Sequence, residues 1–130
     1  MSIDHAARAR ALAGVRFRPQ GRGPDALDCI GLVLSTFDIP AEAAPSNYYL
    51  RGDHRDRVDA HLRTHFRRVS KQSLRPGDVM LLQPTQRQAH LAIRTPAGFV
   101  HAHAGIGKVV ETPGMPEWPL VAVYRKRRSR

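Results

Sequence analysis

The pattern of apolar and polar positions changes about halfway along the chain. In the first half, apolar side chains recur at helical spacing, whereas the second half consists of short β-rich segments between Pro and Gly turns. Good helix formers follow a potential N-cap at Asp4 and continue to Gly14, which predicts a short helix. A longer charged helix is predicted after Asp53, with one apolar stripe at i, i+4, i+8 and i+11. This stripe consists of Val58, Leu62, Phe66 and Val69.

Between these helices lies a segment whose structure is less clear from its pattern. Residues 16–27 contain two prolines and two glycines, which predicts a loop. The following run "CIGLVLSTF", residues 29–37, is almost wholly apolar and fits either a buried strand or a buried helix. Asp28 as an N-cap and the Gly-Pro-rich approach favour a helix that begins at Cys29.

The second half predicts a β-sheet. Its β-rich segments are "LRPGDVMLLQP", "AHLAIRT", "GFVHAHA", "KVVET" and "LVAVYRK". Their Pro and Gly turns are typical of an antiparallel meander. Helices first and strands second predict an α+β domain, with the N-terminal helices packed on one face of a C-terminal antiparallel sheet.

Length and charge limit the organisation of the chain. At 130 residues it fits one domain, which we place at residues 1–124, followed by a basic and disordered tail at 125–130. The N-terminal segment has no uninterrupted apolar h-region and no run approaches a membrane span, so we expect synthesis in the cytoplasm without a signal peptide and no membrane partner. The net charge of +10 favours polyanionic partners such as nucleic acid or an anionic cell wall. Against nucleic acid, aromatic residues are only 6% and do not alternate with arginine.

The single cysteine has two interpretations. A thiol at a helix N-terminus is a candidate nucleophile, because the exposed N–H groups stabilise its thiolate, and Cys29 would then be accessible and acidic. Free cysteine is also among the most buried residue types, and an isolated cysteine in an apolar helix is usually part of the core packing. Taken alone, this segment favours packing.

Histidines downstream change this balance, because a cysteine nucleophile needs a base and the base needs an orienting partner. If "TPAG" forms a hairpin loop of two or four residues, Arg94 pairs with Phe99, and His90, His101 and His103 share one face. His103 then lies opposite His90 and His101 lies diagonal to it. Three histidines on one face also permit a zinc site, although no further ligand stands at a motif-like spacing, and we expect no cofactor.

Four segments in order resemble the NlpC family of papain-like cysteine peptidases. They are "LDCIGLV", "LRPGDVMLL", "AHLAI" and "GFVHAHAG", against the usual D-C-S-G-L-V, P-G-D, H-V-(G/A)-I and F-I-H-A. The resemblance extends from about Gly14 to Tyr124. It is closest to the short stand-alone branch found in tail modules of phages and gene transfer agents, through "FRPQGRGPDALDC" and "VVETP". It implies a papain-like NlpC fold with the catalytic cysteine at a helix N-terminus.

The resemblance also implies a reaction. Family members hydrolyse amide bonds in peptidoglycan stem peptides, commonly between γ-D-glutamate and a diamino acid, and need no metal. Cys29 takes the position of the nucleophile, His90 that of the general base, and His101 that of the residue that orients the base. Zinc would then have no catalytic role.

On the substrate side, the chain departs from the family. Ile30 replaces the usual serine after the cysteine, and Phe17 replaces an upstream tyrosine, so two hydroxyl groups are lost. We expect these two residues, with Asp28 and His103, to contact the substrate. The partners implied are a peptidoglycan stem peptide and other phage-like tail proteins, with action on the cell wall as part of a phage-like particle. Two alternatives stay open: a structural tail or assembly protein with little activity, and a basic nucleic-acid-binding protein.

Overall fold

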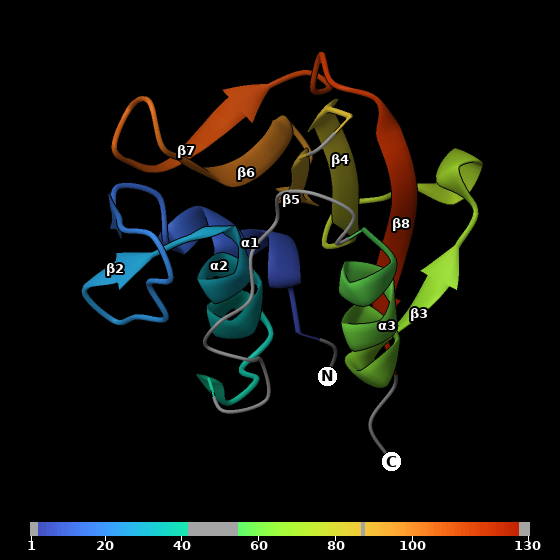
Figure 1. Cartoon of the computed structure of the whole chain (residues 1–130), viewed down its shortest axis with the longest axis horizontal. Helices are drawn as coiled ribbons and strands as arrows, with labels where there is room; N and C mark the ends of the chain where they lie inside the picture. The colour runs from blue at the N-terminus through green and yellow to red at the C-terminus, as the bar shows by residue number, and fades with distance from the viewer. Residues whose placement is uncertain (1–2, 42–54, 87, 128–130) are drawn as a thin grey trace.

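The computed structural model describes residues 3–41, 55–86 and 88–127 as one curled β-sheet with helices against it (Figure 1). The helices of these residues are α1 (His5–Ala11), α2 (Cys29–Thr36), α3 (Arg55–His65) and the short 3-10 helix η2 (Lys71–Ser73). The first three strands are β1 (Arg16–Phe17), β2 (Ala26–Leu27) and β3 (Phe66–Val69). The strands that follow are β4 (Val79–Thr85), β5 (Gln88–Arg94), β6 (Gly98–His103), β7 (Lys108–Pro113) and β8 (Leu120–Lys126).

The eight strands form a single sheet in the order β2-β1-β7-β6-β5-β4-β8-β3. Helix α2 packs on β5 and β6, α1 contacts α2 and β5, and α3 packs on β3 and β8. Figure 1 shows α1 and α2 beneath the curled strands and α3 in front of β8. The predicted α+β architecture is therefore confirmed, with the helices in the N-terminal half and most of the sheet in the C-terminal half.

The two predicted N-caps explain where the first helices begin. Asp4 has an extended backbone, and its side chain accepts the N–H of Ala7. Asp28 is also extended and accepts the N–H of Gly31, so the apolar run from Cys29 forms a helix and not a strand. The main core lies between these helices and the sheet. Its fully buried side chains include Leu27, Leu32, Val79, Leu81, Ile93, Val100, Val109 and Tyr124.

The helix expected to run to Val69 ends at His65, and this part of the prediction is wrong. Phe66–Val69 forms β3, which pairs with β8 from Phe66↔Lys126 to Val69↔Val123. Val58 and Leu62 are buried on α3 as expected, and Phe66 is buried from the strand. Backbone pairing with a distant strand outweighs the helical period of the local sequence. Asp53, the predicted N-cap, lies outside the described residues.

Two further expectations need correction. The segment 16–27, expected to be a loop, contributes the parallel pair β1 and β2, with Phe17 opposite Leu27. The meander holds from β4 to β7, but β8 does not pair with β7. Strand β1 lies on the outer edge of β7 at Arg16↔Lys108, and β8 crosses the sheet and pairs with β4.

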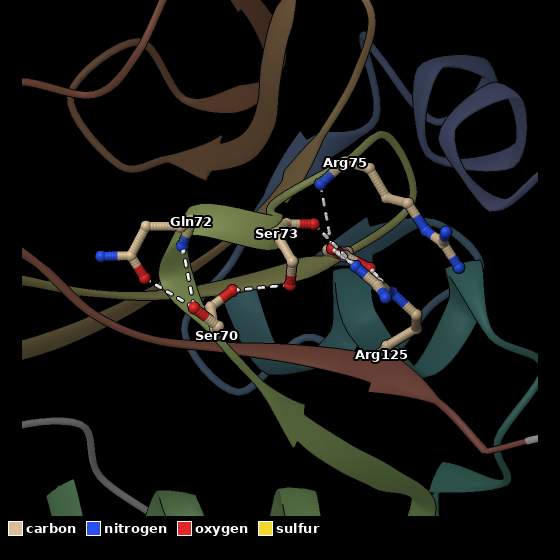
Figure 2. A network of polar contacts seen from close by, with 6 residues as sticks. Ser70, Gln72, Ser73, Arg75 and Arg125 are labelled. Carbon is tan, nitrogen blue, oxygen red and sulfur yellow. Dashed lines mark hydrogen bonds and ion pairs between the residues drawn. The ribbon is translucent and has the colours of Figure 1, made fainter.

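The basic C-terminal segment begins inside the sheet. Strand β8 continues to Lys126, beyond the boundary expected after Tyr124, and the backbone N–H of Arg127 donates to the carbonyl of His65. Arg125 forms an ion pair with the buried Asp78 and donates to the carbonyl of Ser73 (Figure 2). The three last residues, 128–130, lie outside the described residues.

Candidate functional site

A cavity of about 600 Å³ opens where the N-terminus of α2 meets β1, β5 and β6. It brings together all seven residues that the sequence singled out. These are Phe17, Asp28, Cys29, Ile30, His90, His101 and His103. Residues from four separate elements therefore meet in one place, and their proximity is a property of the fold.

Cys29 is the first residue of α2, and the residue is only 5% exposed. Burial, and after it the adjacent charge of Asp28, raise the pKa of the thiol to about 12. Hydrogen bonds from the backbone N–H groups of Leu91 and Ile30 lower the pKa without offsetting that increase. The expectation of an accessible and acidic thiol is therefore wrong: Cys29 is a neutral, largely covered thiol in this structure.

His90 on β5 and His101 on β6 form a direct hydrogen bond, with 2.9 Å between Nε2 of His90 and Nδ1 of His101. The predicted register is confirmed, because Arg94 pairs with Phe99 across the turn. In this register His101 is diagonal to His90, yet it is the hydrogen-bonded partner. His103, expected directly opposite His90, uses its Nδ1 to accept the N–H of Ile106 in the turn between β6 and β7.

Burial also sets the protonation state of this pair. It lowers the pKa of His90 to about 3, with a smaller contribution from the neighbouring imidazoles of His101 and His103. Burial and His103 lower the pKa of His101 to about 4. Both rings are therefore neutral at neutral pH. When Nε2 of His90 is the donor in their hydrogen bond, Nδ1 of His90 carries a free lone pair and can accept a proton.

Trp118 was missed by sequence analysis. It lies between β7 and β8 and lines the cavity, and its ring stands edge-on to both histidines, with centroids 5.5 Å from His90 and 5.9 Å from His101. The half-buried Trp118 side chain packs against the imidazole pair. Its one signal in the sequence is that it is the single tryptophan of the chain.

Arg22 was also missed, and it determines the surroundings of Asp28. Its Nη1 lies 2.7 Å from both carboxylate oxygens of Asp28, and one of these oxygens also caps α2 through Gly31. Asp28 faces the cavity, but its carboxylate is already bound. Arginines are numerous in this chain, and no local spacing distinguishes Arg22 from the others.

A metal centre is the other use that three histidines on one face permit. In the described part of the chain, no group of three or more His, Cys, Asp or Glu side chains is arranged to hold a metal ion. The same residues contain no helix with the length and apolar character needed to cross a bilayer.

Comparison with known proteins identifies the fold. No family model and no curated protein matches the chain. Among solved structures, it is similar to NlpC2 from Trichomonas vaginalis, with a TM-score of 0.69 and 16% identity over 94% of this chain and 44% of that one. It is also similar to NlpC1 from the same organism, with a TM-score of 0.69 and 19% identity over 94% of this chain and 42% of that one. The chain thus spans less than half the length of either neighbour, and it has the NlpC-type fold.

Proposed function

We propose that this protein is a cysteine peptidase that hydrolyses an amide bond in peptidoglycan stem peptides. The observation that carries the proposal is the hydrogen bond between His90 and His101 in the cavity that Cys29 also lines. A nucleophile, a base and a residue that orients the base are the parts that amide hydrolysis by a thiol requires. The NlpC-type fold and the sequence motifs support the same reaction.

In the proposed reaction, the Cys29 sulfur attacks the substrate carbonyl while its proton moves to Nδ1 of His90. Attack and proton transfer occur together, because a pKa of about 12 opposes a standing thiolate. Backbone N–H groups near the start of α2 stabilise the oxyanion, and His90 then protonates the leaving amine. Water, deprotonated by His90, hydrolyses the resulting thioester and releases the carboxylate product and the free thiol.

His101 acts in this scheme through His90. Its Nδ1 accepts the Nε2–H of His90, which fixes the tautomer and the ring orientation of the base and stabilises the imidazolium when it forms. His101 is itself buried and contacts Trp118, so its ring has little freedom to turn away.

The substrate side of the cavity is formed by Phe17, Ile30 and His103. We propose that Phe17 and Ile30 contact the stem peptide through apolar surface, and that the bond cut is the one between γ-D-glutamate and a diamino acid. Asp28 lines the same cavity with its carboxylate bound by Arg22, and its role in substrate binding stays a prediction.

We also propose that the protein is made in the cytoplasm and acts on the cell wall as part of a phage-like tail. The segments "FRPQGRGPDALDC" and "VVETP" support this setting through their resemblance to tail-associated members of the family. The net charge of +10 suits contact with anionic wall polymers.

One observation favours a second function. The covered thiol of Cys29 and its raised pKa are what a structural tail or assembly protein with this fold and little activity would show. Incubation with purified peptidoglycan, followed by mass analysis of released fragments, separates the two. New fragments from the wild type that Cys29→Ala and Cys29→Ser both fail to release support the peptidase. If the wild type releases no fragments beyond those of a protein-free control, the result supports the structural function instead.

A further inference from the structure

The start of α2 carries a charge pair that the proposed mechanism does not use. Nη1 of Arg22 is 2.7 Å from both carboxylate oxygens of Asp28, and each side chain is only 15% exposed. Asp28 directly precedes Cys29, and its Oδ1 also accepts the N–H of Gly31 at 2.7 Å. The same carboxylate therefore caps the helix and lies beside the thiol.

The loop holds Arg22 in this position. The carbonyl of Gly21 accepts the backbone N–H of Asp28 at 3.1 Å, and the guanidinium Nη1 of Arg22 donates to it at 3.3 Å. The same carbonyl packs so closely on Gly31 that a Cβ at residue 31 would lie 2.1 Å from its oxygen. Loop and helix start are therefore one packed unit, in which the guanidinium has a fixed place beside the carboxylate.

These two charges act on the thiol in opposite directions. The Asp28 carboxylate raises the pKa of Cys29, and the Arg22 guanidinium lowers it. The other titratable groups lining the cavity around Cys29 are the imidazoles of His90 on β5 and of His101 and His103 on β6. His90 and His101 are neutral at neutral pH because burial lowers their pKa values, so they do not offset the Asp28 charge.

We propose that Arg22 is a positioning residue that holds the Asp28 cap in place and offsets its negative charge beside Cys29. Because the Arg22 guanidinium balances the charge of the Asp28 carboxylate, the Cys29 sulfur can lose its proton to His90 during attack without repulsion from an unpaired negative charge. The catalytic consequence rests on the function proposed above, whereas the effect on the thiol does not. In this proposal Asp28 serves as a cap and as a charge that Arg22 balances, in place of the substrate contact expected from the sequence.

The test measures the thiol itself. The rate of Cys29 alkylation by iodoacetamide is followed between pH 7 and 11 in the wild type and in Arg22→Gln, Arg22→Lys, Asp28→Asn and the Arg22→Gln/Asp28→Asn double variant. Arg18→Gln is the matched control, because it removes the same charge from an exposed position in the same loop. Asparagine caps a helix about as well as aspartate, so Asp28→Asn keeps the start of α2.

We expect Arg22→Gln to slow alkylation at a fixed pH about tenfold, which corresponds to a rise of about one unit in the thiol pKa. Asp28→Asn should accelerate alkylation by a similar factor, and the double variant should return to within about threefold of the wild type because both charges are gone. Arg22→Lys should restore most of the rate, since it restores the cation. Arg18→Gln should match the wild type.

Equal alkylation rates for the wild type, Arg22→Gln and Asp28→Asn would overturn the proposal. The proposal would also be overturned if Asp28→Asn left the alkylation rate of Cys29 unchanged and raised KM for a stem peptide, because Asp28 would then bind substrate. If Arg22→Gln does not fold, Arg22→Lys and Asp28→Asn decide the matter by the same criteria. If all variants alkylate as expected and the wild type still releases nothing from peptidoglycan, the proposed peptidase function fails and the role of Arg22 stands.

Discussion

Removal of the C-terminal segment from Arg125 onward should destabilise the fold. Nε and Nη2 of Arg125 each lie 2.8 Å from a carboxylate oxygen of Asp78 (Figure 2). Asp78 is only 2% exposed. Nη2 also donates to the carbonyl of Ser73 at 2.9 Å. A chain ending at Tyr124 loses these three contacts and leaves a buried carboxylate without its cation. The sequence predicted a disordered tail from residue 125.

The size of the effect follows from the burial of the pair. Leaving one charge of a buried pair without its partner costs about 3–5 kcal/mol. Here the Arg125 side chain is 17% exposed and Asp78 keeps the backbone N–H of Arg75, so we expect the loss to be about 2–3 kcal/mol. With an unfolding entropy of about 2.1 cal/mol/K per residue, a chain of 130 residues should lose about 7–11 °C in Tm.

Thermal unfolding followed by circular dichroism checks this value. The full chain with Arg125→Ala should melt about 7–11 °C below the wild type. The chain truncated after Tyr124 should melt at least as far below it, because it also loses the pairing of Arg125 and Lys126 with β3. The matched control is truncation after Arg127, which keeps Arg125 and should change Tm by no more than about 1 °C. A chain ending at Tyr124 with the wild-type Tm would refute the reasoning and place the start of a dispensable tail at residue 125.

Three further predictions concern the site. His101→Ala should lower kcat by about 10³-fold with little change in Tm, because it removes the hydrogen-bond partner of the base His90. His103→Ala should act mainly on KM. Steady-state kinetics that show the opposite pattern would exchange the roles of the two histidines. Burial lowers the pKa of His90 to about 3, against about 6.5 in an unfolded chain. As the pH falls, the His90 imidazole therefore takes up a proton in the unfolded state before it does so in the folded state. The free energy of unfolding should decrease as pH falls from about 6.5 toward 3. Urea unfolding at pH 7 and pH 4.5 should show this loss, with a smaller loss in His90→Gln; equal losses in both proteins would contradict it. Gly31→Ala should destabilise the fold by about 1–3 kcal/mol, since its Cβ would lie 2.1 Å from the carbonyl oxygen of Gly21, and an unchanged urea midpoint would count against this packing.

Much of the local structure was determined by the sequence itself. Asp4 and Asp28 cap the helices they were expected to cap, because capping depends on residues within one turn of each other. The strands of the C-terminal half follow the predicted segments, and the four-residue turn sets the register at Arg94↔Phe99. Because side chains alternate along a strand, that register is enough to put His90 and His101 on one face of the sheet.

The tertiary structure decided what depends on contacts between distant residues. Phe66 is at helical spacing from Val58 and Leu62, yet pairing with β8 makes it part of a strand. Either His101 or His103 was a geometrical candidate for the partner of His90, and only the packed site joins His90 to His101. The acidity expected of Cys29 from its helix position is reversed by burial and by Asp28, because the protonation of a thiol depends on everything packed around it.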